Sequence, residues 1–356
     1  MIDWSKSMKQ TFEYYVVDPT TWRDKTRLRN IISSNVERDL ETETLGSATF
    51  ELNEEIGECY IRPYLCVEQN NEKGKFCLGT FLNQTPRKSF DGRSSKLSID
   101  AYTPLLELKE NFPPLGYSLS KGFNIMEYAV KLAQENTRAP VIPAGNEYTL
   151  ASDFVANTDD TWLTYISSLA SNGRCVLGLD EMSRILFEPK IDTDRMQAVY
   201  EYNDDNSSIL YPEISLEEDM YGIPNVVEVI YSGSNLSIFS KVINDDENSP
   251  TSIQARGREI TYRETNPDFG AQPTQAQLDQ YAEELLKQKS TIKRTISYSH
   301  GYCPVRIGDC VRLRYRMAGF DGIKAKVIKQ SIECSTSCKV NETAIYSKNL
   351  WRSRYE

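Results

Sequence analysis

The hydrophobic periodicity of the chain restricts its fold more than any other feature. In the first hundred residues apolar side chains recur at every second position, as in "GSATFELN", where Ala48, Phe50 and Leu52 alternate with polar residues. A period of two places these side chains on one face of a strand. "CYIRPYLCVEQNNEKGKFCLGTFL" gives two apolar runs around a polar turn, and "KLSIDAY" alternates again. Short strands separated by turns predict a small barrel or a sandwich.

The middle of the chain has the period of helices. "NIMEYAVKLAQENT" and "DDTWLTYISSLASNG" repeat apolar residues with helical spacing, which predicts two amphipathic helices. Asn124 and Glu127 are a candidate cap for the first helix, and Gly173 is a candidate stop for the second. "RCVLGLDEMSRILFEP" then predicts a hairpin that turns near Asp180–Ser183.

Strand patterns return after residue 215. "NVVEVIYSGSNLSIFSKVIND" predicts a hairpin, and "TQAQLDQYAEELLKQKS" predicts a helix with Thr274 and Gln277 as a capping box. Because no βαβ rhythm appears, the predicted fold class is α+β, dominated by β-structure. The predicted domains are a first β-barrel domain (1–110), an α+β domain with two helices and a hairpin (111–215), a second β-barrel domain that includes helix 274–289 (216–345) and a C-terminal tail (346–356).

Length and charge exclude several classes of protein. A chain of 356 residues exceeds the size at which one core keeps growing, so two to four domains are expected. The formal net charge of −10 argues against nonspecific wrapping of nucleic acid, which needs a basic face. No run of about 18 apolar residues and no apolar core of a signal peptide is present. We therefore expect no membrane insertion and a reducing cytosol, in which the eight cysteines stay thiols.

The only histidine, His300, lies three residues before a cysteine, and more cysteines follow. The candidate zinc ligands or nucleophiles are His300, Cys303, Cys310, Cys334 and Cys338. Their spacings do not form the ligand pairs typical of structural zinc, so thiols packed on strands are the favoured interpretation. No GxSxG, HExxH, Walker or GxGxxG pattern occurs, and we predict no catalytic residue, metal or cofactor. A carboxylate-based hydrolase stays open, because sequence alone does not pair two carboxylates across a cleft.

A basic stripe follows in "VRLRYRM". Period two places Val311, Leu313, Tyr315 and Met317 on one face of a strand and the arginines on the other. One interpretation is a solvated outer face that protects a sheet edge. The other is a docking face for an acidic neighbour, including another copy of this chain. The predicted interface residues are Arg312, Arg314, Arg316, Lys324 and Lys326.

The order of these elements resembles the baseplate or tail-tip hub proteins of tailed bacteriophages, which also form the N-terminal part of tail-associated lysins. Stretches that carry the resemblance include "RLRNIISSNVERDLETETLGSATFEL", "FCLGTFLNQTPRKSFDGRSSKLSIDAYTPLLELKEN", "TWLTYISSLASNGRCVLGLDEMSRILFEP", "SPTSIQARGREITY" and "CPVRIGDCVRLRY". The likeness spans nearly the whole chain and rests on element order and hydrophobic pattern, without an invariant motif.

The resemblance implies a homotrimer with two tail-tube-like β-barrel domains per chain and helix-bearing α+β inserts. Three copies would form a pseudo-sixfold ring that joins the sixfold tail tube and distal tail protein to a threefold tip. The implied partners are the distal tail protein, the tail tube protein, the C-terminus of the tape measure protein and a tail fibre or tip protein. DNA would pass through the channel without specific binding, so we expect an acidic or neutral lining. The implied location is the phage tail tip of the virion, after assembly in the host bacterial cytoplasm.

Lysin members of the family carry a peptidase or glycosidase beyond the hub. This chain ends at Glu356, where the hub is expected to stop, so we expect a structural hub without enzymatic activity. Two alternatives stay open. One is a phage-associated cell-wall hydrolase, and the other is a β-domain module for glycan or receptor binding, with Trp162 or Trp351 as an exposed aromatic platform.

Overall fold

The computed structural model describes residues 2–90, 92, 95–233, 236–269 and 272–351. The chain divides into two compact units, one of residues 1–214 and 297–344 and one of residues 215–296 and 345–356. Strands dominate both units and helices are few, which confirms the predicted α+β class dominated by β-structure. Within the described ranges no helix is long and apolar enough to cross a membrane.

The N-terminal part of the first unit is an antiparallel sheet. Its strands are β1 (Lys9–Val17), β2 (Asp24–Leu28), β3 (Ile31–Asp39), β4 (Gly46–Leu52), β5 (Tyr60–Gln69), β6 (Glu72–Cys77), β7 (Phe81–Phe90) and β8 (Ser95–Tyr102). The alternation predicted in β4 is confirmed, because Ala48, Phe50 and Leu52 are buried while Thr49 is exposed. Gly46 has φ 135°, and a Cβ there would lie 2.2 Å from the carbonyl oxygen of Glu37, so the β3–β4 turn requires glycine.

Strands from the C-terminal part of the chain continue this sheet. They are β13 (Ala198–Tyr202), β14 (Leu210–Glu218), β18 (Thr291–Gly301), β19 (Cys310–Tyr315), β20 (Phe320–Glu333) and β21 (Lys339–Asn349). β20 pairs antiparallel with β3, with Ile332 opposite Val36, so strands about 300 residues apart in sequence share one core. Among the described residues the strands follow an open path from β14 to β2 and no closed barrel is seen. The two-barrel arrangement therefore stays a prediction.

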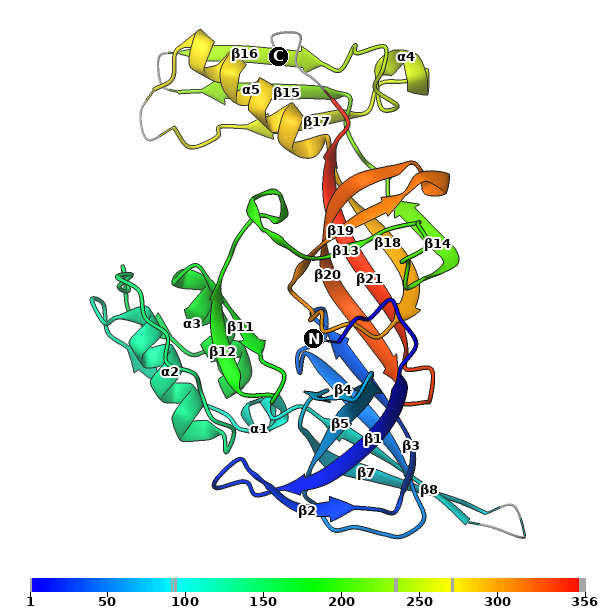
Figure 1. The fold of residues 1–356 in the computed structure, drawn as a ribbon. Coiled ribbons are helices and arrows are strands. Elements are labelled where there is room, and N and C mark those ends of the chain that lie inside the picture. The colour runs from blue at the N-terminus through cyan, green and yellow to red at the C-terminus, as the bar shows by residue number, and fades with distance from the viewer. Residues whose placement is uncertain (1, 91, 93–94, 234–235, 270–271, 352–356) are drawn as a thin grey trace. The chain divides into compact units, whose positions relative to one another are not determined.

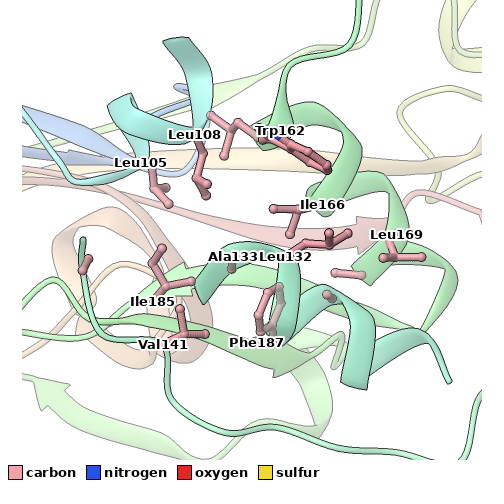
Figure 2. Packing of buried hydrophobic residues seen from close by; sticks show 14 of the residues in the cluster. Leu105, Leu108, Leu132, Ala133, Val141, Trp162, Ile166, Leu169, Ile185 and Phe187 are labelled. Carbon is pink, nitrogen blue, oxygen red and sulfur yellow. The ribbon is translucent and has the colours of Figure 1, made fainter. Parts of the chain in front are cut away.

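An α+β segment lies between these two groups of strands. It contains α1 (Leu105–Glu110), β9 (Ser118–Leu119), α2 (Ile125–Asn136), β10 (Phe154–Val155), α3 (Trp162–Asn172), β11 (Cys175–Leu179), β12 (Ile185–Pro189) and the 3₁₀ turn η1 (Thr193–Arg195). Figure 2 shows its core, in which Leu108 of α1, Leu132 of α2 and Ile166 of α3 pack with Ile185 and Phe187 of β12. Burial of this apolar face is what stabilises three short helices that would be marginal alone.

A group of hydrogen bonds anchors the β11–β12 turn on the first sheet. The carbonyl oxygen of Met182 accepts from the indole nitrogen of Trp22 and from the hydroxyl of Thr80, at 2.9 Å each. Ser183, at φ 56°, accepts from the main-chain nitrogen of Thr80 at 2.7 Å. The buried guanidinium of Arg62 completes the group by donating from Nε to Thr80 Oγ1 at 2.8 Å. The turn predicted at Asp180–Ser183 thus fastens the α+β segment to the sheet.

The second unit is a three-stranded sheet with one helix across it, in the ranges that the structure describes (Figure 1). Its elements are β15 (Val226–Ser232), β16 (Ser237–Ile243), α4 (Ile253–Arg256), β17 (Thr261–Thr265) and α5 (Gln275–Lys289). β15 pairs antiparallel with β16 and parallel with β17. The predicted capping box of α5 is present, and Leu278, Ala282 and Leu286 are fully buried against the sheet. Trp351 packs into the same core, 6% exposed.

Candidate functional site

The predicted basic stripe lies on the β19–β20 hairpin. Val311 and Leu313 are fully buried and Arg314 is exposed, so this part of the alternation is confirmed. The alternation was predicted to continue to Met317, and this is wrong. β19 ends at Tyr315, and Arg316–Ala318 form a 3₁₀ turn (η2) that closes on Gly319 at φ 73°, which leaves Met317 91% exposed. The 3₁₀ turn ends the period of two, because its residues no longer alternate between two faces.

β13 covers the outer edge of this hairpin. It pairs in parallel with β19, and its carboxylates meet the arginines: Arg314 lies 2.9 Å from Glu201. Arg316 lies 3.5 Å from Asp204, in the loop after β13. Lys324 Nζ donates to two main-chain carbonyls at 3.1 and 2.9 Å, near η1. Three of the five predicted interface cations therefore already have partners within the chain.

The other two cations are half-buried. Arg312 lies opposite Lys324 in the β19–β20 ladder, and its buried Nε has no hydrogen-bond partner among the described residues. Lys326 lies opposite Cys310. Placing like charges opposite each other destabilises a ladder, and the carbonyls that hold Lys324 offset this cost. Docking of an acidic neighbour on these five residues stays a prediction.

The histidine predicted as a ligand or base belongs to a polar network in the core of the first unit. Every member is at most 3% exposed: Tyr202, Tyr298, His300, Cys303, Gln330 and Glu342. Glu342 is the centre of the network. It lies 3.4 Å from His300 Nε2 and accepts from Gln330 Nε2 at 2.6 Å, and it also accepts from the phenol of Tyr298. The Tyr202 hydroxyl lies 3.2 Å from His300 Nε2 and 3.2 Å from Cys303 Sγ.

Burial and the charge of the partner shift the pKa values of His300 and Glu342 in opposite directions. Burial lowers the pKa of His300, but the adjacent Glu342 carboxylate outweighs it and raises the pKa to about 10. For Glu342, burial raises the pKa, while His300 and the hydrogen bonds from Gln330 and Tyr298 bring it below its ordinary value. The pair is therefore ionised at neutral pH. His300 Nδ1 donates to the carbonyl of Gly301 at 2.7 Å, so both imidazole N–H groups are used.

This geometry does not form a catalytic or zinc centre. Cys303 Sγ is 4.0 Å from His300 Nδ1, but both side chains are enclosed in the core. Burial raises the pKa of the Cys310, Cys334 and Cys338 thiols, which keeps them protonated. In the described part of the chain no three His, Cys, Asp or Glu side chains are placed to share a metal ion.

Sequence reasoning found His300 but missed its partners. Glu342, Gln330 and Tyr202 come from three different strands and share no local motif. One signal was present: in "KVNETAIY" the carboxylate of Glu342 occupies the same face as Val340 and Ala344, which are both buried. A charged residue on the apolar face of a strand indicates a buried partner. Trp162 is buried in the core of the α+β segment, as its place on the apolar stripe of its helix predicts, and Trp351 is buried in the core of the second unit.

The fold is similar to that of two solved tail proteins. The tail protein from Neisseria meningitidis MC58 is 12% identical, and the match covers 96% of this chain and 98% of that chain with a TM-score of 0.60. The 43 kDa tail protein of prophage MuSo2 from Shewanella oneidensis is 11% identical, and the match covers 94% and 98% with a TM-score of 0.58. No protein-family model and no curated protein matches the sequence. The resemblance to phage tail proteins is thus confirmed at the level of the fold.

Proposed function

We propose that a chain with this fold is a structural component of a bacteriophage tail, at the baseplate or tail tip. One observation carries the proposal: the similarity to two tail proteins extends over almost the whole length of both partners, rather than over one shared domain. Fold alone does not determine function. The proposal is supported further by the core of the first unit, where the reactive side chains are enclosed rather than presented to a substrate.

The specific role that we propose is a trimeric hub. Three copies would form a pseudo-sixfold ring of tube-like β-domains that joins the tail tube and distal tail protein to the threefold tip and surrounds the DNA exit channel. The continuous, mostly antiparallel sheet built from both ends of the chain supports this role, because a stiff β-wall suits a ring. The tape measure protein and a tail fibre or tip protein would contact the same ring, and the protein would reside in the virion.

We propose further that the protein has no catalytic activity. The only histidine is buried in an ion pair with Glu342, and the Cys303 thiol beside it is enclosed, which supports a role in packing. In the proposed ring, the channel lining is acidic or neutral, so that phosphates are not retained.

Light scattering coupled to size-exclusion chromatography tests the trimer. We expect a species of about three times the 40.7 kDa mass of one chain, at least when the distal tail protein is added. Immunogold labelling of virions should place the chain at the tail tip. A monomer both alone and with the distal tail protein, or gold particles elsewhere on the virion, would exclude the hub. A lytic band in peptidoglycan zymography would exclude the non-enzymatic role.

A further inference from the structure

The N-terminal segment forms one wall of a pocket in the first unit. This N-terminal pocket has a volume of about 430 Å³ and is lined by residues 2–5, 200–203 and 207–209. The volume falls within the range of about 300–1,000 Å³ that is typical of small-molecule sites. Two of its lining residues contact features described above, since Glu201 pairs with Arg314 and the Tyr202 hydroxyl lies 3.2 Å from His300 Nε2. Nothing in the proposed structural role requires the pocket.

Two aromatic rings that line the pocket are held in place by other rings. Trp4 makes edge contacts with Phe76 and Tyr302, at centroid distances of 5.0 and 5.4 Å. Tyr200 lies 4.9 Å from the ring of Tyr202, which is itself fixed in the buried network. Rings that are already fixed lose little conformational entropy when a ligand packs on them. The pocket is thus preorganised for a ligand with an apolar face.

Three of the residues that line the pocket carry polar groups that can donate or accept hydrogen bonds. They are the indole N–H of Trp4, the hydroxyl of Tyr200 and the side-chain amide of Asn203. Together they provide donors and acceptors on the same residues that supply the rings. A ligand that combines an apolar face with several hydroxyl or amide groups would contact both the aromatic rings and the polar groups.

The charges at the pocket are already balanced. The Asp3 carboxylate lies 3.1 Å from Lys6 Nζ, and the Glu201 carboxylate lies 2.9 Å from Arg314 Nε. A charged ligand would therefore gain no unpaired countercharge, whereas a neutral ligand can use the remaining lone pairs of both carboxylates as hydrogen-bond acceptors.

We propose that the N-terminal pocket binds a short neutral saccharide, one or two sugar units long. The C–H face of a pyranose packs on Trp4 or Tyr200, and the sugar hydroxyls bond to Tyr200, Asn203 and the two carboxylates. In such a site the aromatic ring provides apolar contact area and the nearby polar groups fix the orientation of the ligand. The proposal goes beyond the structural role and does not depend on it.

The pocket binds the sugar without cleaving it. Hydrolysis of a glycosidic bond requires one carboxylic acid that stays protonated near neutral pH, so that it can protonate the leaving oxygen. Hydrogen bonds from Ser5 and Lys6 lower the pKa of Asp3, and Glu201 is held by Arg314. A carboxyl group with a lowered pKa, such as that of Asp3, does not supply that proton.

Saturation-transfer NMR with the full chain tests the proposal, using glucose, galactose, N-acetylglucosamine and their β-linked disaccharides as probes. We expect transfer to at least one probe at millimolar concentration, and a change in tryptophan fluorescence on titration. Tyr200→Phe and Asn203→Ala should each weaken that binding by about fivefold, the value of one hydrogen bond. Tyr211→Phe is the matched control, because Tyr211 is 38% exposed and does not line the pocket.

Two results would overturn the proposal. One is the absence of transfer from every probe, which would leave a peptide side chain as the better occupant. The other is binding that the Tyr200 and Asn203 variants leave unchanged while their thermal unfolding matches that of the parent chain. Release of a smaller sugar from a disaccharide probe would contradict the inference that the pocket does not cleave.

Discussion

A glutamate and a histidine without access to water face each other in the core of the first unit. Removing one member of such a pair leaves an uncompensated buried charge, which typically costs about 3–5 kcal/mol. We therefore expect Glu342→Gln to lower the free energy of unfolding by about 3 kcal/mol in urea denaturation. The double variant with His300→Gln should recover part of this loss, because it removes both charges. Equal losses in the single and double variants would show that the ion pair is not what holds these side chains.

The same pair predicts how stability depends on pH. The pKa of His300 is raised from 6.5 to about 10 in the folded state, so its contribution is complete below pH 6.5 and is lost as pH rises toward 10. The pKa of Glu342 is lowered from 4.5, so its contribution is present above pH 4.5 and is lost as pH falls. The difference in unfolding free energy between the parent chain and His300→Gln should thus be largest between pH 4.5 and pH 6.5. Urea titrations across the pH range measure it, and a difference that stays constant up to pH 10 would contradict the assignment.

Thr80 tests the fastening of the β11–β12 turn. Thr80→Val keeps the shape of the side chain but removes its hydrogen bonds to Met182 and Arg62, which leaves a buried guanidinium N–H unpaired. We expect a loss of about 2 kcal/mol in chemical denaturation. Thr85 lies five residues further along, on β7, and is exposed, so Thr85→Val should change stability by no more than about 0.5 kcal/mol. A similar small effect at both positions would show that the hydrogen bonds of Thr80 do not contribute to the stability of the fold.

At the scale of elements, helices with a strong local signal were predicted closely. α2 begins after Asn124, whose side chain accepts from Glu127 N as expected, and α5 begins after Thr274 with its capping box. α3 begins after Thr161, which caps it in a capping box with Thr164. The helix ends at Gly173 as predicted, but the left-handed residue is Arg174, at φ 56°. Caps depend on two or three neighbouring residues, so sequence suffices to find them within one position.

Strand partners were not predictable in the same way. Nothing local in "SIECSTSC" indicates that β20 pairs with β3, or that β13 runs parallel to β19 and supplies Glu201 to Arg314. Such pairings depend on closing loops of hundreds of residues, and the hydrophobic pattern of a strand fixes its face but not its neighbour. The buried network and the N-terminal pocket depend on these pairings, which is why sequence reasoning reached only His300 and Cys303.

The cap of α5 provides a test at this scale. Thr274→Ala removes the acceptor for Gln277 N, at 3.4 Å, and should destabilise the second unit by about 1 kcal/mol. Thr274→Ser keeps a hydroxyl and should stay close to the parent chain. Hydrogen exchange along α5 measures the effect where it arises, and equal protection in both variants would argue against a capping role.

At the scale of the whole molecule, the net charge of −10 sets what the surface attracts. Carboxylates within the chain pair with Arg314 and Arg316, which neutralises part of the positive charge of the basic hairpin. We expect fluorescence anisotropy with duplex DNA to show no binding tighter than about 10⁻⁴ M at about 0.15 M salt. Submicromolar binding would contradict a surface that lets DNA pass freely.

The few residues before β1 determine where a recombinant form of this protein should begin. The main chain of Asp3 exchanges hydrogen bonds of 2.8 Å with the Gln69 amide, and Trp4 shields the rings of Phe76 and Tyr302. A truncated protein that begins at Lys9 would expose those two rings to solvent, which favours aggregation. The same truncation would remove one wall of the N-terminal pocket, so ligand screens on the truncated protein would give false negatives.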